Sequence, residues 1–224
     1  MSHSFPSDTA DAPDLETFDA TFIETAMRMA ASDGWARLSL VDVALEVGAP
    51  VDAVRSRFPF KYTILLRIGQ MADESAMRDD GMGATLRERL FDLLMRRLDV
   101  FQQYREGLRA ALHALPYDPA LAALLGATTL DTMRWIADLA GIDLSGFGGA
   151  LRVQAVTGIW TYTLRAWEQD DSPDLATTMA TLDKALDRAE RFGMLKPSTT
   201  RLTGENDHGS LPDFSQDHAA DIVL

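Results

Sequence analysis

The residues with the clearest chemical potential lie in one short stretch of the chain, between residues 39 and 62. It holds three cations close together, Arg55, Arg57 and Lys61. An arginine side chain can form two hydrogen bonds with the edge of a guanine base, and further basic side chains can supply charge to the phosphate backbone. This stretch is therefore a candidate nucleic-acid interface. The alternative is that the three side chains are solvated surface charges whose stems cover apolar neighbours.

Patterns that would support catalysis or metal binding are poor elsewhere. Three of the four histidines lie in terminal segments too polar to fold, which leaves His113 without a partner for a metal site or a catalytic triad. The chain has no cysteine, so disulfides and thiolate metal sites are excluded. Asp170 and Asp171 suit turn and capping chemistry better than acid–base catalysis. We expect no enzyme activity, no metal and no cofactor.

The composition is that of an ordinary globular protein. Of 224 residues, 46% are hydrophobic and 25% are charged, and the formal net charge of −13 argues against indiscriminate nucleic-acid binding. The acidity is uneven, because residues 16–70 are nearly neutral while both ends are acidic. No apolar run approaches the roughly 20 residues of a membrane helix, and the first residues do not resemble a secretory signal. We predict a cytoplasmic protein with no membrane partner.

The elements that must position the basic stretch are helical. Apolar residues recur every three or four positions along the body of the chain, and no alternating run of strand length appears, which predicts an all-α fold of about nine helices. Low apolar content predicts a disordered arm over 1–14 and a disordered acidic tail over 196–224. Between them we expect a first domain over 15–70 and a larger helical domain over 71–195.

Local signals predict the boundaries of several helices. The first helix should end near Asp33-Gly34, and Ser39, with Asp42 three residues later, should cap a second helix that ends at Gly48. A third helix of barely two turns should run from Pro50 to Pro59, and a fourth from Lys61 to about 77. Further along, we expect a helix near 128–140, a turn over 141–149, and a final hairpin in which Ser172 caps the last helix.

Two short helices around Gly48 form the plan of a helix-turn-helix. Here the chain resembles the TetR/AcrR family of bacterial transcription regulators, in a first helix ending at Gly34-Trp35, in Ser39-Leu40, in Val47-Gly48 and in the string Phe58-Pro59-x-Lys61 before Leu65-Leu66. The resemblance covers residues 16–70 by motif and the remainder by helix count. A two-helix corner is also a common packing unit, and the Phe58 to Lys61 string favours the DNA-binding interpretation over that alternative.

The resemblance implies a mostly helical regulator that binds operator DNA as a homodimer, most simply a repressor that a small apolar ligand releases. It implies that Ser39, Lys61 and the adjacent Tyr62 contact the DNA backbone. It further implies that the exposed positions of the third helix meet base edges in the major groove, namely Pro50, Val51, Asp52, Arg55, Ser56 and Arg57. Pro50-Val51, Asp52 and Arg55 depart from the residues common at these positions in the family.

A helix-turn-helix needs a second copy to reach two half-sites, so the chain should contain a dimer interface. We predict it in the final hairpin, at Val153, Trp160, Leu164, Trp167, Leu175, Met179, Leu182 and Leu186. The alternative is that these apolar stripes pack inward within one subunit. Adaptable and aromatic side chains of the middle helices suit an apolar ligand pocket, although ordinary core packing explains them as well. They are Met95, Phe101, Tyr104, Met133, Trp135 and Tyr162.

A second resemblance supports a different function. Residues 158–192, with a Trp-x-x-Asp-Asp-Ser step before a Leu-Asp-x-x-Leu helix, are similar to the end of the ubiquinone-biosynthesis lipid-binding proteins, which share this helical fold. That resemblance implies a lipid or isoprenoid in the interior and no role at DNA. We rank this function second, as the alternative, because the acidic tail offers no basic amphipathic helix that could bind a membrane surface.

Overall fold

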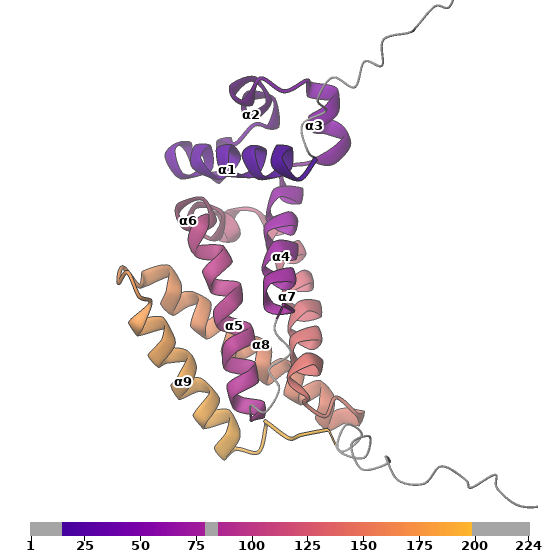
Figure 1. Ribbon diagram of the computed structural model, residues 1–224, viewed down its shortest axis with the longest axis vertical. Coiled ribbons are helices and arrows are strands. Elements are labelled where there is room, and N and C mark those ends of the chain that lie inside the picture. The colour runs from indigo at the N-terminus through magenta and orange to yellow at the C-terminus, as the bar shows by residue number, and fades with distance from the viewer. Residues whose placement is uncertain (1–14, 79–84, 199–224) are drawn as a thin grey trace, which may run out of the picture.

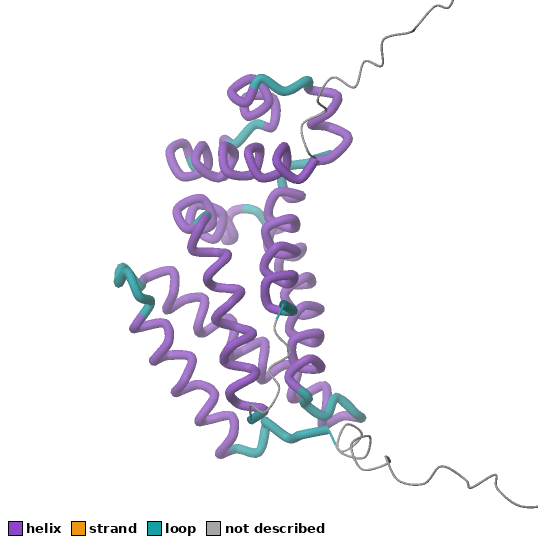
Figure 2. Tube along the Cα trace, in the orientation of Figure 1, coloured by secondary structure: helices purple, strands orange, loops and turns teal. Residues whose placement is uncertain are grey.

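The computed structural model describes residues 15–78 and 85–198, and these residues form an all-α structure. Figure 2 shows helices joined by short loops, with no strand in the described part. Nine α-helices and two short 3-10 helices, η1 and η2, are present there, as predicted. In chain order their bounds are α1 Leu15–Asp33, η1 Trp35–Arg37, α2 Leu40–Val47, α3 Val51–Arg57, α4 Tyr62–Ala76, α5 Leu86–Gln103, α6 Arg105–Ala114, η2 Leu115–Tyr117, α7 Pro119–Ala140, α8 Gly146–Gln169 and α9 Ala176–Arg191.

The helices form a small head and a larger body. Figure 1 shows α1, α2 and α3 together at one end, with α4 running from the head into the body. The body packs α5 against α4, α7 and α9, and α8 pairs with α9 in the antiparallel hairpin that the sequence predicts. Head and body also meet where α6 packs on α1. The described helices contain none that is long and apolar enough to cross a membrane.

The apolar faces of the short head helices pack on one another and belong to a buried cluster that continues into the body. The rings of Phe22 on α1 and Phe58 after α3 stack with centroids 4.6 Å apart. Trp35 of η1 and Val54 of α3 are buried beside the inward face of α2. This packing fixes which side of α3 faces solvent.

The contact between head and body depends on a glycine. A Cβ added to Gly107 of α6 would lie only 2.5 Å from the carbonyl oxygen of Met27 on α1. Only a residue without a side chain permits this approach of two helices. The position of α6 against the head therefore depends on Gly107.

Several predicted boundaries are confirmed and others are corrected. As predicted, Ser39 caps the start of α2 and the left-handed Gly48 ends it. The helix expected near 128–140 begins earlier, at Pro119, because Asp118 caps it there. The turn expected over 141–149 is shorter, since α8 already begins at Gly146.

The last helix begins later than predicted. Ser172 lies in the turn and α9 starts at Ala176, whose N–H donates to the Ser172 hydroxyl at 3.1 Å, while the buried Asp170 accepts from Thr178 two residues further on. The Asp170 carboxylate accepts hydrogen bonds from the backbone N–H of Thr178 at 2.8 Å, from its hydroxyl at 2.8 Å, and from the N–H and hydroxyl of Ser172 at 3.1 and 2.5 Å. Burial alone would raise the pKa of Asp170, but these bonds to the ionised form hold it far below its usual value.

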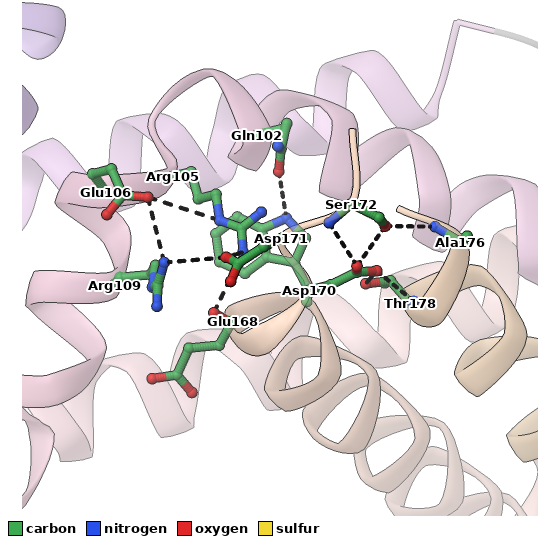
Figure 3. Close-up of polar contacts among 11 residues, drawn as sticks. Gln102, Arg105, Glu106, Arg109, Glu168, Asp170, Asp171, Ser172, Ala176 and Thr178 are labelled. Carbon is green, nitrogen blue, oxygen red and sulfur yellow. Dashed lines mark hydrogen bonds and ion pairs between the residues drawn. The ribbon is translucent and has the colours of Figure 1, made fainter. Parts of the chain in front are cut away.

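Figure 3 shows that the same turn is joined to the start of α6. Arg105 reaches Asp171 at 3.4 Å, and its guanidinium lies 5.7 Å from the ring of Trp167. The Trp167 indole N–H donates to the side-chain oxygen of Gln102 at 2.9 Å. The α8–α9 turn is thus fastened to the junction of α5 and α6.

The first residues of the predicted tail form backbone hydrogen bonds with the body. Residues 196–198 run beside the α7–α8 turn, where the Asp143 N–H donates to the Lys196 carbonyl at 2.9 Å and the Ser198 N–H donates to the Gly141 carbonyl at 2.8 Å. These backbone bonds hold residues that composition alone assigned to the tail. The predicted arm, 1–14, and the remainder of the tail, 199–224, lie outside the described residues.

Candidate nucleic-acid interface and ligand cavity

The helix-turn-helix is built by local signals in the sequence. The Ser39 hydroxyl accepts a hydrogen bond from the Asp42 N–H at 3.4 Å and begins α2. Gly48 adopts a φ of 68°, a left-handed conformation that lets the chain turn sharply into α3. Val54 and Phe58 face the core of the head, so the opposite side of α3 is available to a partner.

The outer face of α3 consists mainly of residues predicted to meet DNA. Arg55 is exposed and forms no ion pair with the described residues, which leaves its guanidinium available for a base edge. The Ser56 hydroxyl donates to the Ala53 carbonyl at 2.8 Å and keeps its lone pairs outward. The remaining exposed positions of this face are Pro50, Val51 and Asp52.

The Arg57 guanidinium forms an ion pair within the subunit. Its Nε and Nη2 donate to the two carboxylate oxygens of Asp19 on α1, at 2.5 and 2.6 Å. Asp19 is 6% exposed and the Arg57 side chain is 30% exposed, so this bidentate pair is partly buried, and the pKa of Arg57 is raised by the hydrogen bonds to Asp19. The pair fastens the end of α3 to α1. Arg57 thereby positions α3, and its predicted contact with DNA stays a prediction.

Lys61 and Tyr62 connect the start of α4 to neighbouring elements. The Lys61 Nζ donates to the Trp35 carbonyl at 3.2 Å and lies 5.6 Å from the Trp35 ring. The Tyr62 hydroxyl donates to the carboxylate of Asp118, at 2.9 Å from its nearer oxygen, and this bond raises the pKa of Tyr62. Asp118 also caps α7 by accepting from the Leu121 N–H. Lys61 and Tyr62, which are predicted to contact the DNA backbone, thus also hold α4 in place.

One exposed aromatic residue beside α3 was missed by the sequence analysis. Phe60 follows Pro59 in the turn between α3 and α4, and 54% of it is exposed. A large apolar side chain next to a turn proline, outside any apolar stripe, is the signal that would have identified it.

The body contains a cavity of about 800 Å³, open to solvent, between α4, α5, α6, α7 and α8. Its walls are mostly apolar, with Phe101, Trp160 and Trp167 among them. Such a volume and lining are typical of small-molecule sites. Three charged residues also line it, and the sequence analysis missed all of them: Asp73, Arg97 and Asp131.

Of the six residues predicted to line a pocket, Phe101 alone lines this cavity. Met133 is fully buried in the core, whereas Trp135 and Tyr162 are 60% and 58% exposed. Trp135 lines a second, smaller cavity of about 220 Å³ that shares Asp73 and Asp131 with the first. Met95 and Tyr104 are partly buried against the core. A sequence does not show which side of each helix faces the cavity, and that decides the lining.

The residues predicted to form a dimer interface mostly belong to the subunit's own core. The buried members are Val153, Trp160, Trp167, Leu175, Leu182 and Leu186. Leu164 lines the cavity, and Met179 is partly exposed. The inward-packing alternative thus describes this stripe, because each helix of the hairpin buries its apolar face on its neighbours.

Another stripe of α8 is exposed instead. Phe147, Leu151 and Tyr162 are 82%, 47% and 58% exposed, and their spacing, with exposed Gly158 between them, places them along one side of the helix.

Among the described residues, no group of three histidine, aspartate or glutamate side chains could hold a metal ion.

Comparison with known proteins agrees with this architecture. No protein-family model matches the chain, and no curated protein matches its sequence. Among solved structures, the chain is similar to the crystal structure of the TetR transcriptional regulator from Nitrosomonas europaea ATCC 19718, with a TM-score of 0.67 at 20% sequence identity. The likeness covers 78% of this chain and 99% of the other. The chain therefore has the fold of a TetR transcriptional regulator, as its helix-turn-helix motif predicts.

Proposed function

We propose that the chain is a DNA-binding transcriptional regulator that binds operator DNA as a homodimer, acts as a repressor and is released by a small ligand held in the body. The observation that carries this proposal is the outer face of α3. It is exposed, it contains Arg55, and its orientation is fixed by the core contacts of Val54 and by the Arg57–Asp19 pair. The similar fold of a TetR transcriptional regulator supports it.

At DNA, α3 enters the major groove and Arg55 contacts a guanine. Ser39 and Lys61 flank the groove at the starts of α2 and α4, where they face the phosphates, as the family resemblance implies. Asp52 accepts a hydrogen bond from a cytosine amino group. Arg57 contributes by holding α3 in the orientation that this docking needs.

The dimer forms through the exposed apolar stripe of α8 that contains Phe147, Leu151 and Tyr162. Contiguous exposed apolar side chains on a soluble protein mark interaction surfaces, and a two-fold interface uses the same patch on both subunits. This assignment replaces the stripe of the hairpin that faces the subunit's own core. Pairing of two heads then reaches successive half-sites of an operator.

Release follows from a shift between two arrangements of the dimer. A ligand in the cavity contacts α4, and α4 leads directly from α3 into the body. A ligand that binds one position of α4 more tightly than another shifts the population toward that position and changes the spacing of the two α3 helices.

The test is a fluorescence anisotropy titration with labelled DNA from upstream of the protein's own gene, repeated at several salt concentrations with unrelated DNA as competitor. We expect selective binding that weakens steeply with salt, because phosphate contacts release counterions. Arg55→Ala should abolish the selectivity, whereas Arg188→Ala, a matched change on the exposed side of α9, should not. Selective binding that survives Arg55→Ala would refute the assigned face.

The alternative is a lipid-binding protein of the same fold without a role at DNA. The observation that favours it is the large, mostly apolar cavity, together with an outer face of α3 that presents Asp52 as well as Arg55. Native mass spectrometry of the purified protein distinguishes the two. A stoichiometric co-purified lipid, with no selective DNA binding, would support the lipid carrier and contradict the regulator.

A further inference from the structure

The cavity in the body has an uneven distribution of charge. Its apolar wall includes leucines of α6, α7 and α8, while Arg97 of α5 is buried deep in the lining with only 4% of its surface exposed. The two acidic lining residues are more accessible. The Asp73 side chain is 36% exposed, and Asp131 is exposed as well.

Arg97 is held by aromatic rings and by one carboxylate. Its guanidinium carbon lies 5.3 Å from the centre of the Trp160 ring and 5.8 Å from that of Phe101, and both rings line the cavity. Its Nη1 forms an ion pair with Asp73 of α4. Cation–π contacts of this kind keep a guanidinium charged in apolar surroundings. Burial lowers the pKa of Arg97 to about 10, which still leaves it protonated at neutral pH.

The hydrogen-bonding capacity of Arg97 is not filled. Its Nε is buried and has no acceptor among the described residues. A buried donor without an acceptor is unfavourable, and most such groups in proteins find a partner or a ligand. The half-exposed Asp73 carboxylate can be solvated without Arg97, but the buried guanidinium has no comparable access to water.

The charge that a ligand can relieve is therefore the buried positive one. An ammonium ligand would compete with water for two accessible carboxylates, whereas an oxyanion would supply an acceptor to a guanidinium that is 4% exposed and whose Nε has none. A carboxylate matches the fork of a guanidinium with two oxygens and can engage Nε together with one Nη. The remaining lining accepts an apolar body.

We propose that the cavity binds an apolar monocarboxylate, either aliphatic or aromatic, whose carboxylate pairs with Arg97 in place of Asp73. The exchange frees Asp73, which lies on α4, the helix that continues from α3. The ligand thus breaks the ion pair that joins α4 to α5. The binding step stands by itself, and its consequence for DNA rests on the proposed function above.

The experiment measures the binding of three probes of the same chain length to the full-length protein, namely decanoate, 1-decanol and decylamine. Each is used below its solubility limit or micelle concentration. Binding is followed by tryptophan fluorescence, because Trp160 and Trp167 line the cavity. We expect saturable binding of decanoate with a Kd roughly 10-fold or more below that of 1-decanol, the worth of one charge-assisted hydrogen bond. Decylamine should bind more weakly than either.

Two variants assign the preference to one residue. Arg97→Met keeps the apolar stem and removes the guanidinium, so decanoate should lose its advantage over 1-decanol. Arg134→Met removes a charge from the exposed side of α7, outside both cavities, and should leave the advantage intact. Because the three probes are first compared on the wild-type protein, the test does not depend on the folding of Arg97→Met.

A competition variant adds a positive signal. Asp73→Asn removes the residue that competes for Arg97, so decanoate should bind more tightly to it than to the wild-type protein. Equal affinity for the three probes, tightest binding of decylamine, or no saturable binding of decanoate would overturn the proposal.

The DNA arm is kept separate. If the protein selects a DNA sequence, decanoate should release that DNA from the wild-type protein and not from Arg97→Met. Decanoate binding that depends on Arg97, in a protein that selects no DNA, would support the carboxylate site and refute the regulator. DNA binding without a preference among the probes would do the reverse.

Discussion

Replacing Asp170 by asparagine should destabilise the protein far more than the same change at the adjacent Asp171. Asp170 is 4% exposed and accepts four hydrogen bonds in the α8–α9 turn, two of them from Thr178 in the first turn of α9. The amide keeps one acceptor oxygen and puts an NH₂ group against two donors. A hydrogen bond to a charged group contributes about 1.5–3 kcal/mol against about 1 kcal/mol for a neutral one, and a buried donor left without an acceptor costs about 1–3 kcal/mol. We expect a loss of about 2–4 kcal/mol in the free energy of unfolding.

Asp171 provides the matched control. Its side chain is 87% exposed and its contact with Arg105 is 3.4 Å long, so Asp171→Asn should change the free energy of unfolding by no more than about 0.5 kcal/mol. The assay is urea unfolding followed by circular dichroism at a fixed protein concentration near pH 7. A loss at Asp170 as small as that at Asp171 would refute the assignment of Asp170 as the buried cap of α9.

The same comparison has a defined dependence on pH. The pKa of Asp170 is far below its usual value in the folded protein, while in the unfolded chain it is about 3.9. The stabilisation by its ionised form is therefore fully present above about pH 5 and declines as the pH falls below 3.9 toward the folded pKa. The difference in stability between wild type and Asp170→Asn should shrink over that range, and a difference that grows on acidification would contradict the account.

Further predictions concern the head and its link to the body. Gly107→Ala should cost about 1–3 kcal/mol of unfolding free energy, because its Cβ meets the backbone of α1. The control Gly69→Ala, which has open space around the added Cβ in α4, should stabilise by about 0.5–1 kcal/mol. Equal effects of the two changes in thermal unfolding would contradict the close approach of α6 to α1. Arg57→Ala should cost about 3 kcal/mol in urea unfolding, because it removes the bidentate partner of the buried Asp19 carboxylate on α1. Arg55→Ala should leave the stability unchanged and lose selective DNA binding. The opposite ranking would exchange the roles of the two arginines. Tyr62→Phe should lower the unfolding free energy by about 1 kcal/mol through loss of its hydrogen bond to the α7 cap, and an unchanged urea midpoint would show that this bond is not made.

The helix boundaries that could be predicted from the sequence are set by interactions between residues close together in the chain. Ser39, with Asp42 three residues on, and Gly48 specify the limits of α2 by local hydrogen bonds and backbone conformation. The same local signals at Phe58 and Pro59 separate α3 from α4. These groups act within one turn of helix, so no knowledge of the tertiary structure was needed.

The roles of individual side chains depended on partners distant in sequence. Arg55 and Arg57 look equivalent until Asp19, 38 residues before Arg57, is found against one of them. Likewise an apolar stripe such as that of Trp160 and Trp167 is buried whether its partner is another helix of the same subunit or a second copy, and periodicity does not distinguish the two.

Arg97 left a signal that could have been used. It stands within the apolar stripe of α5 that runs through Leu90, Leu94 and Phe101, where a charge is unexpected. A charge on the inner face of an amphipathic helix is retained only with a partner or a function. The sequence could therefore mark the residue, but not the cavity or the aromatic rings that surround it.

The most direct test of the central claim is to select DNA from a random-sequence duplex pool with the wild-type protein and with Arg55→Ala, and to sequence the bound fraction. The account predicts that wild type enriches a two-fold symmetric sequence with half-sites about one helical turn apart, and that Arg55→Ala loses a guanine preference within each half-site. A wild-type protein that enriches no sequence above the unselected pool at low salt would contradict it.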